Sequence, residues 1–218
     1  MHEDCLYKNI NFCETDCPNL CIRYSEMKYL LKYSNLPESQ RCFHKLYPDE
    51  CDVSAFEKLA DIQSNIKEFI QNGNNLYLYS KWVGNGKTTW MIKLLMQYFH
   101  EIAVGNCHRE RGLFINVPTY LMQSKNAIST PDPKLEELKQ LMMKVDVLVL
   151  DDITAVKMSN YDYSTLLGYV DSCIFSGRSI FCTGNYKPNE LDEVLGARLA
   201  SRVCSGTIIE LNGKDMRK

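Results

Sequence analysis

From residue 51 onward, short apolar strands alternate with amphipathic helices, and this alternation restricts the fold more than any other feature of the sequence. Strands alternating with helices predict an α/β fold, in which a parallel sheet is covered by helices on both faces. Ligands of such sheets bind at the carboxyl ends of the strands. The strands are expected at residues 76–80, 112–116, 145–150, 179–183 and 207–211.

The expected helices have recognisable periodicity or end signals. Apolar residues recur at three- and four-residue spacing from Val53 to Phe69, which is typical of an amphipathic helix, and the run Asn72 to Asn75 ends it. Asp132 can cap a helix whose first turn contains Pro133. Further helices are expected at residues 88–102, 161–175 and 191–203.

Length and composition divide the chain into two parts. A chain of 218 residues accommodates one ordinary domain and a small appendage. Residues 1–50 are rich in Cys and Tyr and show no strand pattern, whereas residues 51–218 carry the α/β pattern. No apolar run approaches the roughly 20 residues that span a bilayer, and the acidic N-terminus has no apolar core of a secretory signal. We therefore expect a cytoplasmic protein without membrane contact.

A phosphate-binding loop is expected between the first strand and the helix that follows it. The P-loop pattern is G-x-x-x-x-G-K-[ST], and the sequence matches it except that Lys81 replaces the first glycine. Glycines let backbone N–H groups turn toward phosphate oxygens, and a helix N-terminus attracts the anion. Lys87 would neutralise phosphate charge, and Thr88 would bind Mg²⁺ through its hydroxyl. The expected ATP/ADP-binding residues are Gly84, Asn85, Gly86, Lys87, Thr88 and Thr89.

Polar residues follow two of the later strands. Asp151 and Asp152 come directly after the apolar strand that ends at Leu150. If this strand lies beside the P-loop strand, Asp151 would hold Mg²⁺ and Asp152 would orient or deprotonate the attacking water. Asn185 follows the next strand and could hydrogen-bond the γ-phosphate and that water. The alternatives are surface aspartates and an ordinary turn asparagine.

Arg198 and Arg202 are four residues apart on one expected helix, so they share a face. One interpretation is a salt-bridged or solvated helix face. The other is an arginine finger that reaches the ATP of a neighbouring subunit and stabilises charge in the transition state. A finger supplied in this way requires a homo-oligomer in the ATP-bound state.

These motifs resemble those of the DnaC/DnaI-type helicase loaders, which are AAA+ ATPases with a five-stranded parallel P-loop sheet and little or no C-terminal lid. The resemblance covers roughly residues 53 to 218. In that family the matching positions are Walker A (Lys87, Thr88), Walker B (Asp151, Asp152), sensor 1 (Asn185) and the arginine finger (Arg202), with Arg198 beside it. The segments that carry the resemblance are 81–89, 145–153, 180–186 and 195–202.

The resemblance implies a role in loading a hexameric DnaB-type replicative helicase onto single-stranded DNA. In that clade a segment after the second strand contacts DNA, and here Tyr120 and Lys125 could touch base and phosphate. A solvated helix is an equal alternative for both residues. The net charge of −2 does not favour nucleic-acid binding by charge alone, so any such contact must be local or supplied by an oligomer.

Six of the ten cysteines lie at or before Cys51. Disulfides are rare in the cytosol, so clustered cysteines suggest a metal. The loaders also carry a small N-terminal zinc domain that binds the helicase. We expect a structural Zn²⁺, with an Fe–S cluster or buried free thiols as alternatives. The expected ligands are Cys5, Cys13, Cys17 and Cys21, with Cys42 and His44 as further candidates.

Three other functions share parts of this pattern. An IstB-like transposition helper ATPase would carry nearly identical motifs and differ in its partner. A non-hydrolysing adaptor that sequesters a helicase or loader would use ATP only to fix its shape, and the presence of Asp151, Asp152 and Asn185 argues against it. A nucleotide kinase would need a mobile, Arg-rich lid, and the sequence shows no such segment.

Overall fold

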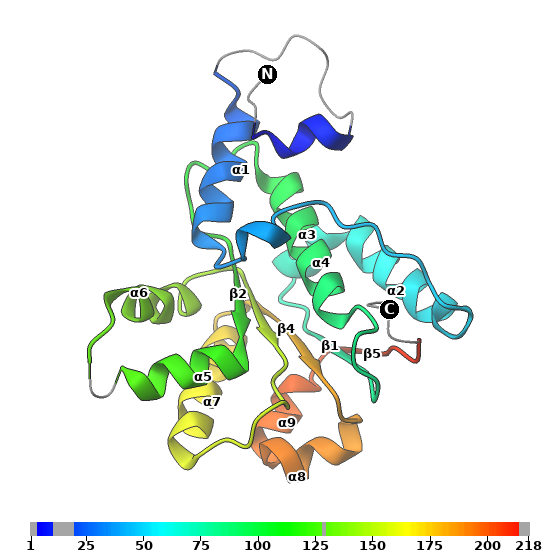
Figure 1. Ribbon diagram of the computed structural model, residues 1–218, viewed down its shortest axis with the longest axis vertical. Coiled ribbons are helices and arrows are strands. Elements are labelled where there is room, and N and C mark those ends of the chain that lie inside the picture. The colour runs from blue at the N-terminus through cyan, green and yellow to red at the C-terminus, as the bar shows by residue number, and fades with distance from the viewer. Residues whose placement is uncertain (1–3, 11–19, 128–129, 214–218) are drawn as a thin grey trace.

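The computed structural model describes residues 4–10, 20–127 and 130–213. Its centre is one sheet of five parallel strands in the order β2-β3-β4-β1-β5 (Figure 1). All residues of β1, β3 and β4 are buried, as expected for strands covered on both faces. The predicted five-stranded parallel fold is therefore confirmed. The strands are β1 Leu76–Tyr79, β2 Gly112–Asn116, β3 Val147–Asp151, β4 Ser179–Gly184 and β5 Thr207–Glu210.

Helices form a layer on each face of the sheet. The first layer packs in one hydrophobic cluster around the central helix α4, in which Leu94 and Phe99 are fully buried. It contains α1 Ile22–Tyr33, α2 Val53–Ser64, α3 Ile66–Gln71 and α4 Lys87–Ile102. The second layer packs around residues such as Leu148 and Leu166. It contains α5 Val117–Asn126, α6 Pro133–Met142, α7 Asn160–Phe175, α8 Leu191–Leu195 and α9 Ala197–Val203.

Two helices expected as single elements are each divided. The helix expected from Val53 is interrupted at Asn65, whose N–H groups bond to the carbonyls at the end of α2. The helix expected at 191–203 is interrupted at Gly196, which has a φ of 78°. A residue with a side chain rarely adopts that φ, and a Cβ there would lie 3.3 Å from the Tyr163 ring. The glycine therefore sets the direction of α9.

The described part of residues 1–50 packs on the sheet domain. The N–H of Phe114 on the edge strand β2 donates to the Ser34 carbonyl (2.8 Å), and Asn35 Nδ2 donates to the Phe114 carbonyl (2.9 Å). Cys5 is buried in the same hydrophobic cluster as α4. A division of the chain at residue 50 stays a prediction. Short 3₁₀ helices are η1 Leu6–Ile10, η2 Glu38–Gln40, η3 Glu50–Asp52 and η4 Pro188–Glu190.

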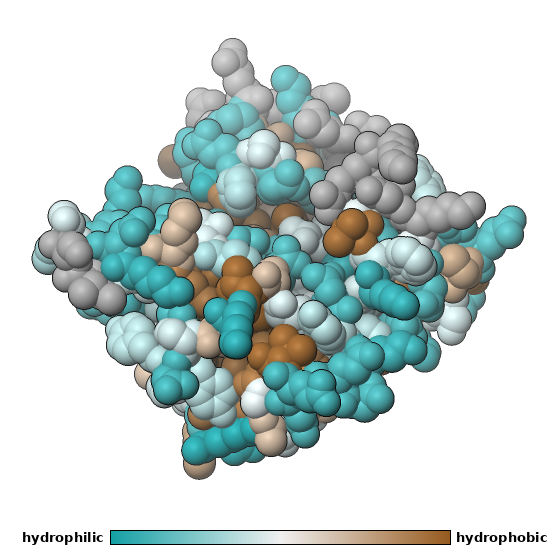
Figure 2. All heavy atoms as spheres, turned by 60° about the horizontal axis from the view of Figure 1, so that its bottom comes forward, coloured by the Kyte–Doolittle hydropathy of each residue, from teal (hydrophilic) through white to brown (hydrophobic). Residues whose placement is uncertain are grey.

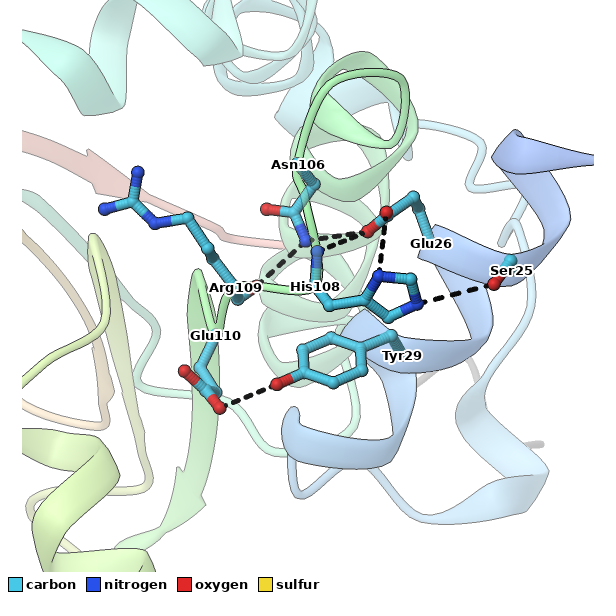
Figure 3. Close-up of polar contacts among 7 residues, drawn as sticks. All are labelled: Ser25, Glu26, Tyr29, Asn106, His108, Arg109 and Glu110. Carbon is cyan, nitrogen blue, oxygen red and sulfur yellow. Dashed lines mark hydrogen bonds and ion pairs between the residues drawn. The ribbon is translucent and has the colours of Figure 1, made fainter.

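Polar contacts fix α1 against the loop between α4 and β2 (Figure 3). The buried carboxylate of Glu26 accepts hydrogen bonds from Asn106 Nδ2 (3.2 Å) and from the His108 backbone N–H (3.0 Å). The same carboxylate lies 3.2 Å from His108 Nδ1. One turn later, the Tyr29 hydroxyl donates to Glu110 (2.8 Å). In the described part of the chain, no helix is both long and apolar enough to cross a bilayer.

Candidate nucleotide-binding site

The loop between β1 and α4 is shaped by two glycines and a buried asparagine. Gly84 and Gly86 have φ values of 80° and 91°, which glycine adopts without strain. The Asn85 side chain is buried, and its Nδ2 donates to Ser80 Oγ and to the Leu211 carbonyl (3.3 Å) just after β5. This side chain therefore fastens the loop to the sheet, and a contact of Asn85 with nucleotide stays a prediction.

Lys81 stands where the P-loop pattern has its first glycine, and the backbone accepts it. Lys81 is exposed and is not among the described residues with a positive φ, so no glycine is required there. Ser80 Oγ accepts a hydrogen bond from the Trp82 N–H (3.0 Å) and so holds the turn that begins the loop. The departure from the pattern thus leaves the loop geometry intact.

Lys87 begins α4 with its ammonium group inside the loop. The side chain is 7% exposed, and Nζ donates to the Trp82 carbonyl (3.0 Å) and to Asn85 Oδ1 (3.5 Å). Thr88 and Thr89 follow in the first turn of α4 and line the same cavity. The loop therefore places an ammonium group, backbone N–H groups and the positive end of a 16-residue helix together, which is a site for phosphate.

Asp151 lies beside this loop although β3 is not the neighbour of β1. Strand β4 lies between them, so the two strands are not neighbours, but α4 packs over β3 and β4. As a result the Thr88 hydroxyl donates to Asp151 Oδ1 at 2.9 Å. Burial raises the pKa of Asp151, and hydrogen bonds from Thr183 and Thr88 oppose that rise. A hydroxyl and a carboxylate are oxygen ligands that suit Mg²⁺.

Two further residues hold Asp151, and the sequence analysis did not single them out. The Thr183 hydroxyl donates to Asp151 Oδ1 (2.8 Å) and accepts from the Asp152 N–H (2.8 Å). Asn116, at the end of β2, lies with Nδ2 3.5 Å from Asp151 Oδ2. Both residues stand at the carboxyl ends of the strands that flank β3, and this position was the available signal.

Asp152 and Asn185 complete the rim of the site. Asp152 has a φ of 56°, a left-handed conformation that aspartate tolerates better than most residues. The Asn185 N–H donates to Thr154 Oγ1 (2.9 Å). Asn185 Oδ1 is buried and has no hydrogen-bond partner among the described residues. A buried carbonyl without a partner is costly, which suits a group that bonds a ligand or its water.

These residues surround one cavity of about 830 Å³. Figure 2 turns forward the lower end of Figure 1, where the strands end, and shows apolar atoms near the centre of a largely polar surface. All the residues expected to bind nucleotide line the cavity, as do Asp152 and Asn185. The lining is Gln40, Lys45, Leu46, Val83 to Thr89, Ile92, Phe114, Asn116, Asp151, Asp152, Ala155 and Asn185.

Arg198 and Arg202 do not line this cavity. Both extend from α9 to Asp171 on α7: Arg198 Nη2 lies 2.7 Å from Oδ2, and Arg202 Nε lies 3.0 Å from Oδ1. Arg198 is 63% exposed and Arg202 is 38% exposed. Within one copy the two arginines thus form a salt-bridged helix face, and a role toward a neighbouring subunit stays a prediction.

The expected DNA-contacting residues differ in exposure. Tyr120 is 3% exposed and its ring packs against Tyr169, and a contact of Tyr120 with a base stays a prediction. Lys125 is exposed and forms an ion pair with Asp162 (3.2 Å). The alternative of a solvated helix face fits the exposed Lys125 but not the buried Tyr120.

The described cysteines do not form a metal site. Cys5 is buried in the hydrophobic cluster, and Cys21 caps α1 by accepting from the Tyr24 N–H. Cys13 and Cys17 lie outside the described residues. Among the described residues, no group of three or more His, Cys, Asp or Glu side chains could hold a metal ion. Zinc binding by the N-terminal cysteines is therefore not supported by the described part of the chain.

Comparisons with known proteins agree with this geometry. A model of the bacterial DnaA ATPase domain family matches residues 52–210. The replicative helicase loader DnaI of Bacillus subtilis (strain 168) is 26% identical over 259 residues, covering 96% of this chain and 79% of that protein. A crystal structure of the DnaC helicase loader matches with a TM-score of 0.63 and 15% identity, covering 77% of this chain and 94% of that chain.

Longer initiators share the fold over part of their length. A replication initiator DnaA bound to AMPPCP and single-stranded DNA matches with a TM-score of 0.56 and 19% identity, covering 76% of this chain and 48% of that chain. This chain also covers 51% of a DNA replication initiation factor, so it spans about half the length of these initiators. The chain therefore belongs to the family of the bacterial DnaA ATPase domain, and its resemblance to the DnaC/DnaI type of AAA+ protein is confirmed.

Proposed function

We propose that this protein binds ATP with Mg²⁺, hydrolyses the ATP, and uses this cycle to load a replicative hexameric helicase onto single-stranded DNA. The observation that carries the nucleotide part is the contact of the Thr88 hydroxyl with Asp151 (2.9 Å), next to the buried Lys87 ammonium. This arrangement provides oxygen ligands for a divalent cation within a loop that suits phosphate.

Each group has a distinct role in the proposed reaction. Lys87 and the loop N–H groups bind the phosphates, and Mg²⁺ held by Thr88 and Asp151 would neutralise charge on the β- and γ-phosphates. Asp152 accepts a proton from, or orients, the attacking water. Asn185 would orient the same water through its Oδ1, which has no hydrogen-bond partner among the described residues.

The exposed arginines support an assembly in which one copy completes the site of the next. Arg202, with Arg198 beside it, would reach the ATP of a neighbouring copy in a homo-oligomer and stabilise transition-state charge. Hydrolysis is then weak in the monomer and stimulated by assembly or by a partner. For this to happen, the arginines must leave Asp171, with which they pair within one copy.

The proposed partner follows from the relatives. DnaI of Bacillus subtilis is named a replicative helicase loader, and it matches this chain nearly from end to end. By that likeness the helicase would dock on the N-terminal part, and single-stranded DNA would make a local contact elsewhere. Zinc bound by Cys5, Cys13, Cys17 and Cys21 remains part of this proposal. The alternative function is that of an IstB-like transposition helper, which a binding test would indicate if the partner proved to be a transposase instead of a helicase.

Nucleotide binding is tested by changing the loop lysine. Lys87→Ala removes the ammonium that the loop encloses, so the affinity for both ATP and ADP should fall below detection in isothermal titration with Mg²⁺. Lys58→Ala, which changes an exposed lysine on α2, is the matched control and should bind as the wild type does. Unchanged affinity in Lys87→Ala contradicts the P-loop assignment.

A further inference from the structure

The segment between α1 and α2 forms one side of the nucleotide cavity. It runs over α4 in Figure 1, in the colours between the blue of α1 and the cyan of α2. From this segment, Gln40, Lys45 and Leu46 line the same cavity as the phosphate-binding loop. The cavity therefore combines residues from the N-terminal part of the chain with residues of the P-loop.

This segment is fixed at both ends. Phe43 and Leu46 pack against the hydrophobic cluster around α4, and the Phe43 ring meets His100 edge-on with 6.0 Å between ring centroids. Asp52 is fully buried at the far end and accepts hydrogen bonds from the N–H groups of Asn212 (2.6 Å) and Gly213 (2.8 Å). The backbone between these anchors is therefore held over α4 in a defined path.

Lys45 lies between the anchors Phe43 and Leu46 and lines the cavity. Phe43 and Leu46 face the core, whereas Lys45 is exposed and lines the cavity. Lys45 forms no ion pair with any residue that the structure describes. Among the described lining residues, the other cation is Lys87, whose ammonium bonds to the loop carbonyl of Trp82. One wall of the cavity thus offers a second ammonium group.

We propose that Lys45 binds the terminal phosphate of ATP held in the P-loop. This inference rests on the proposed nucleotide binding and deepens it. A triphosphate carries more negative charge than one ammonium neutralises, and catalysis of phosphoryl transfer depends on cations placed around the terminal group. Lys45 lines the same cavity as Asn116 and Asp152, which stand at the strand ends where the terminal phosphate would lie.

A contact made by ATP and not by ADP would link nucleotide state to the N-terminal part of the chain. The segment that carries Lys45 leads directly from α1, so the terminal phosphate would restrain α1 through that segment. If bound ATP raises the affinity of the protein for a partner that fixes α1, that partner raises the affinity for ATP by the same factor, because coupling between two sites is reciprocal. Lys45 would therefore distinguish ATP from ADP and would connect the terminal phosphate to α1.

The test compares ATP with ADP. Affinities of a hydrolysis-resistant fluorescent ATP analogue and of the matching ADP analogue are measured with Mg²⁺ for wild type, Lys45→Ala, Lys45→Arg and the control Lys58→Ala. Lys45→Ala should weaken the ATP analogue roughly tenfold, the size of one charge-assisted hydrogen bond, with little change for ADP. Lys45→Arg should retain the ATP affinity, and Lys58→Ala should match wild type.

The possible outcomes separate the two proposals. Equal weakening of both analogues by Lys45→Ala, or no change in either, overturns the assignment of Lys45 to the terminal phosphate. In that case wild-type binding that Lys87→Ala removes still supports nucleotide binding in the P-loop. If the wild type binds neither analogue, the proposed function fails and the assignment of Lys45 fails with it.

Discussion

The buried carboxylate of Asp151 lowers the stability of the metal-free protein, although the proposed binding of Mg²⁺ needs its charge. The carboxylate is buried between Thr88 and Thr183, and burial raises its pKa above the usual range of an aspartate. Because the folded pKa is raised, the charged form destabilises the metal-free fold at neutral pH. This penalty disappears as the pH falls through the pKa of the folded state.

Asp151→Asn should therefore stabilise the metal-free protein while removing Mg²⁺-dependent hydrolysis. We expect Tm to rise at pH 7, because the neutral amide avoids the cost of burying a charge. The gain should shrink as the pH is lowered, because the wild-type carboxyl is then protonated too. The measurement is thermal unfolding of wild type and Asp151→Asn in EDTA, from pH 7 down to acidic pH. A lower Tm at neutral pH would mean that the carboxylate is stabilising.

Thr183 is a second residue with a testable role. Its hydroxyl bonds to the Asp151 carboxylate and to the backbone N–H of Asp152, so it positions the carboxylate of the first and the backbone of the second without lining the cavity. Thr183→Val keeps the side-chain volume but loses both bonds, and hydrolysis should fall about 10- to 100-fold, as for other partners of metal-binding groups. Thr183→Ser should keep most of the activity. Comparable loss in both variants would point to packing instead.

At the scale of elements, α1 is fixed by one buried carboxylate. Glu26→Ala would leave the His108 N–H without its acceptor and would remove one of the two acceptors of Asn106 Nδ2, which also donates to the Arg109 carbonyl, at a cost of roughly 1–3 kcal/mol (Figure 3). Urea unfolding should show this loss, and hydrogen exchange should rise locally in the loop at residues 103–111. The matched variant Glu110→Ala removes the acceptor of the Tyr29 hydroxyl in a partly buried bond, and should cost less than the loss of the buried Glu26 carboxylate. Equal costs would contradict a special role for Glu26.

The contact between α7 and α9 controls whether the arginines can act on a neighbour. Asp171→Asn weakens the pairs with Arg198 and Arg202, which are partly exposed, so the stability loss should stay under about 1 kcal/mol. If the arginines act in trans, their release should raise the concentration-dependent ATPase rate, and Arg202→Ala should abolish that dependence. A full rate in dilute, monomeric Arg202→Ala would exclude the trans role.

The sequence predicted the elements better than their junctions. The five strands, the P-loop and the capping of α6 by Asp132 were predictable because each has a local signal in periodicity, spacing or cap chemistry. The break at Gly196 and the order of β1, β4 and β3 depend on packing between distant segments. Thr183 and Asn116 carried a signal in their position at strand ends, whereas Lys45 could not be chosen from sequence, because only the fold brings its segment to the cavity.

At the scale of the whole molecule, the N-terminal part and the sheet domain share one hydrophobic cluster over the described residues. A partner bound near α1 and a nucleotide bound at the P-loop would therefore act on opposite ends of one connected body. We therefore expect the bound partner to change the affinity of the protein for nucleotide, and the bound nucleotide to change its affinity for the partner, since coupling between two sites is reciprocal.

The most direct test is the ATPase rate with and without the replicative helicase of the same cell and single-stranded DNA, together with co-elution on a sizing column. We expect co-elution with the helicase in the presence of ATP and a stimulated ATPase rate, and we expect Lys87→Ala to lose both. Hydrolysis that is indifferent to the helicase, with no co-elution, would contradict the loader function and point to another DNA-remodelling partner, such as a transposase.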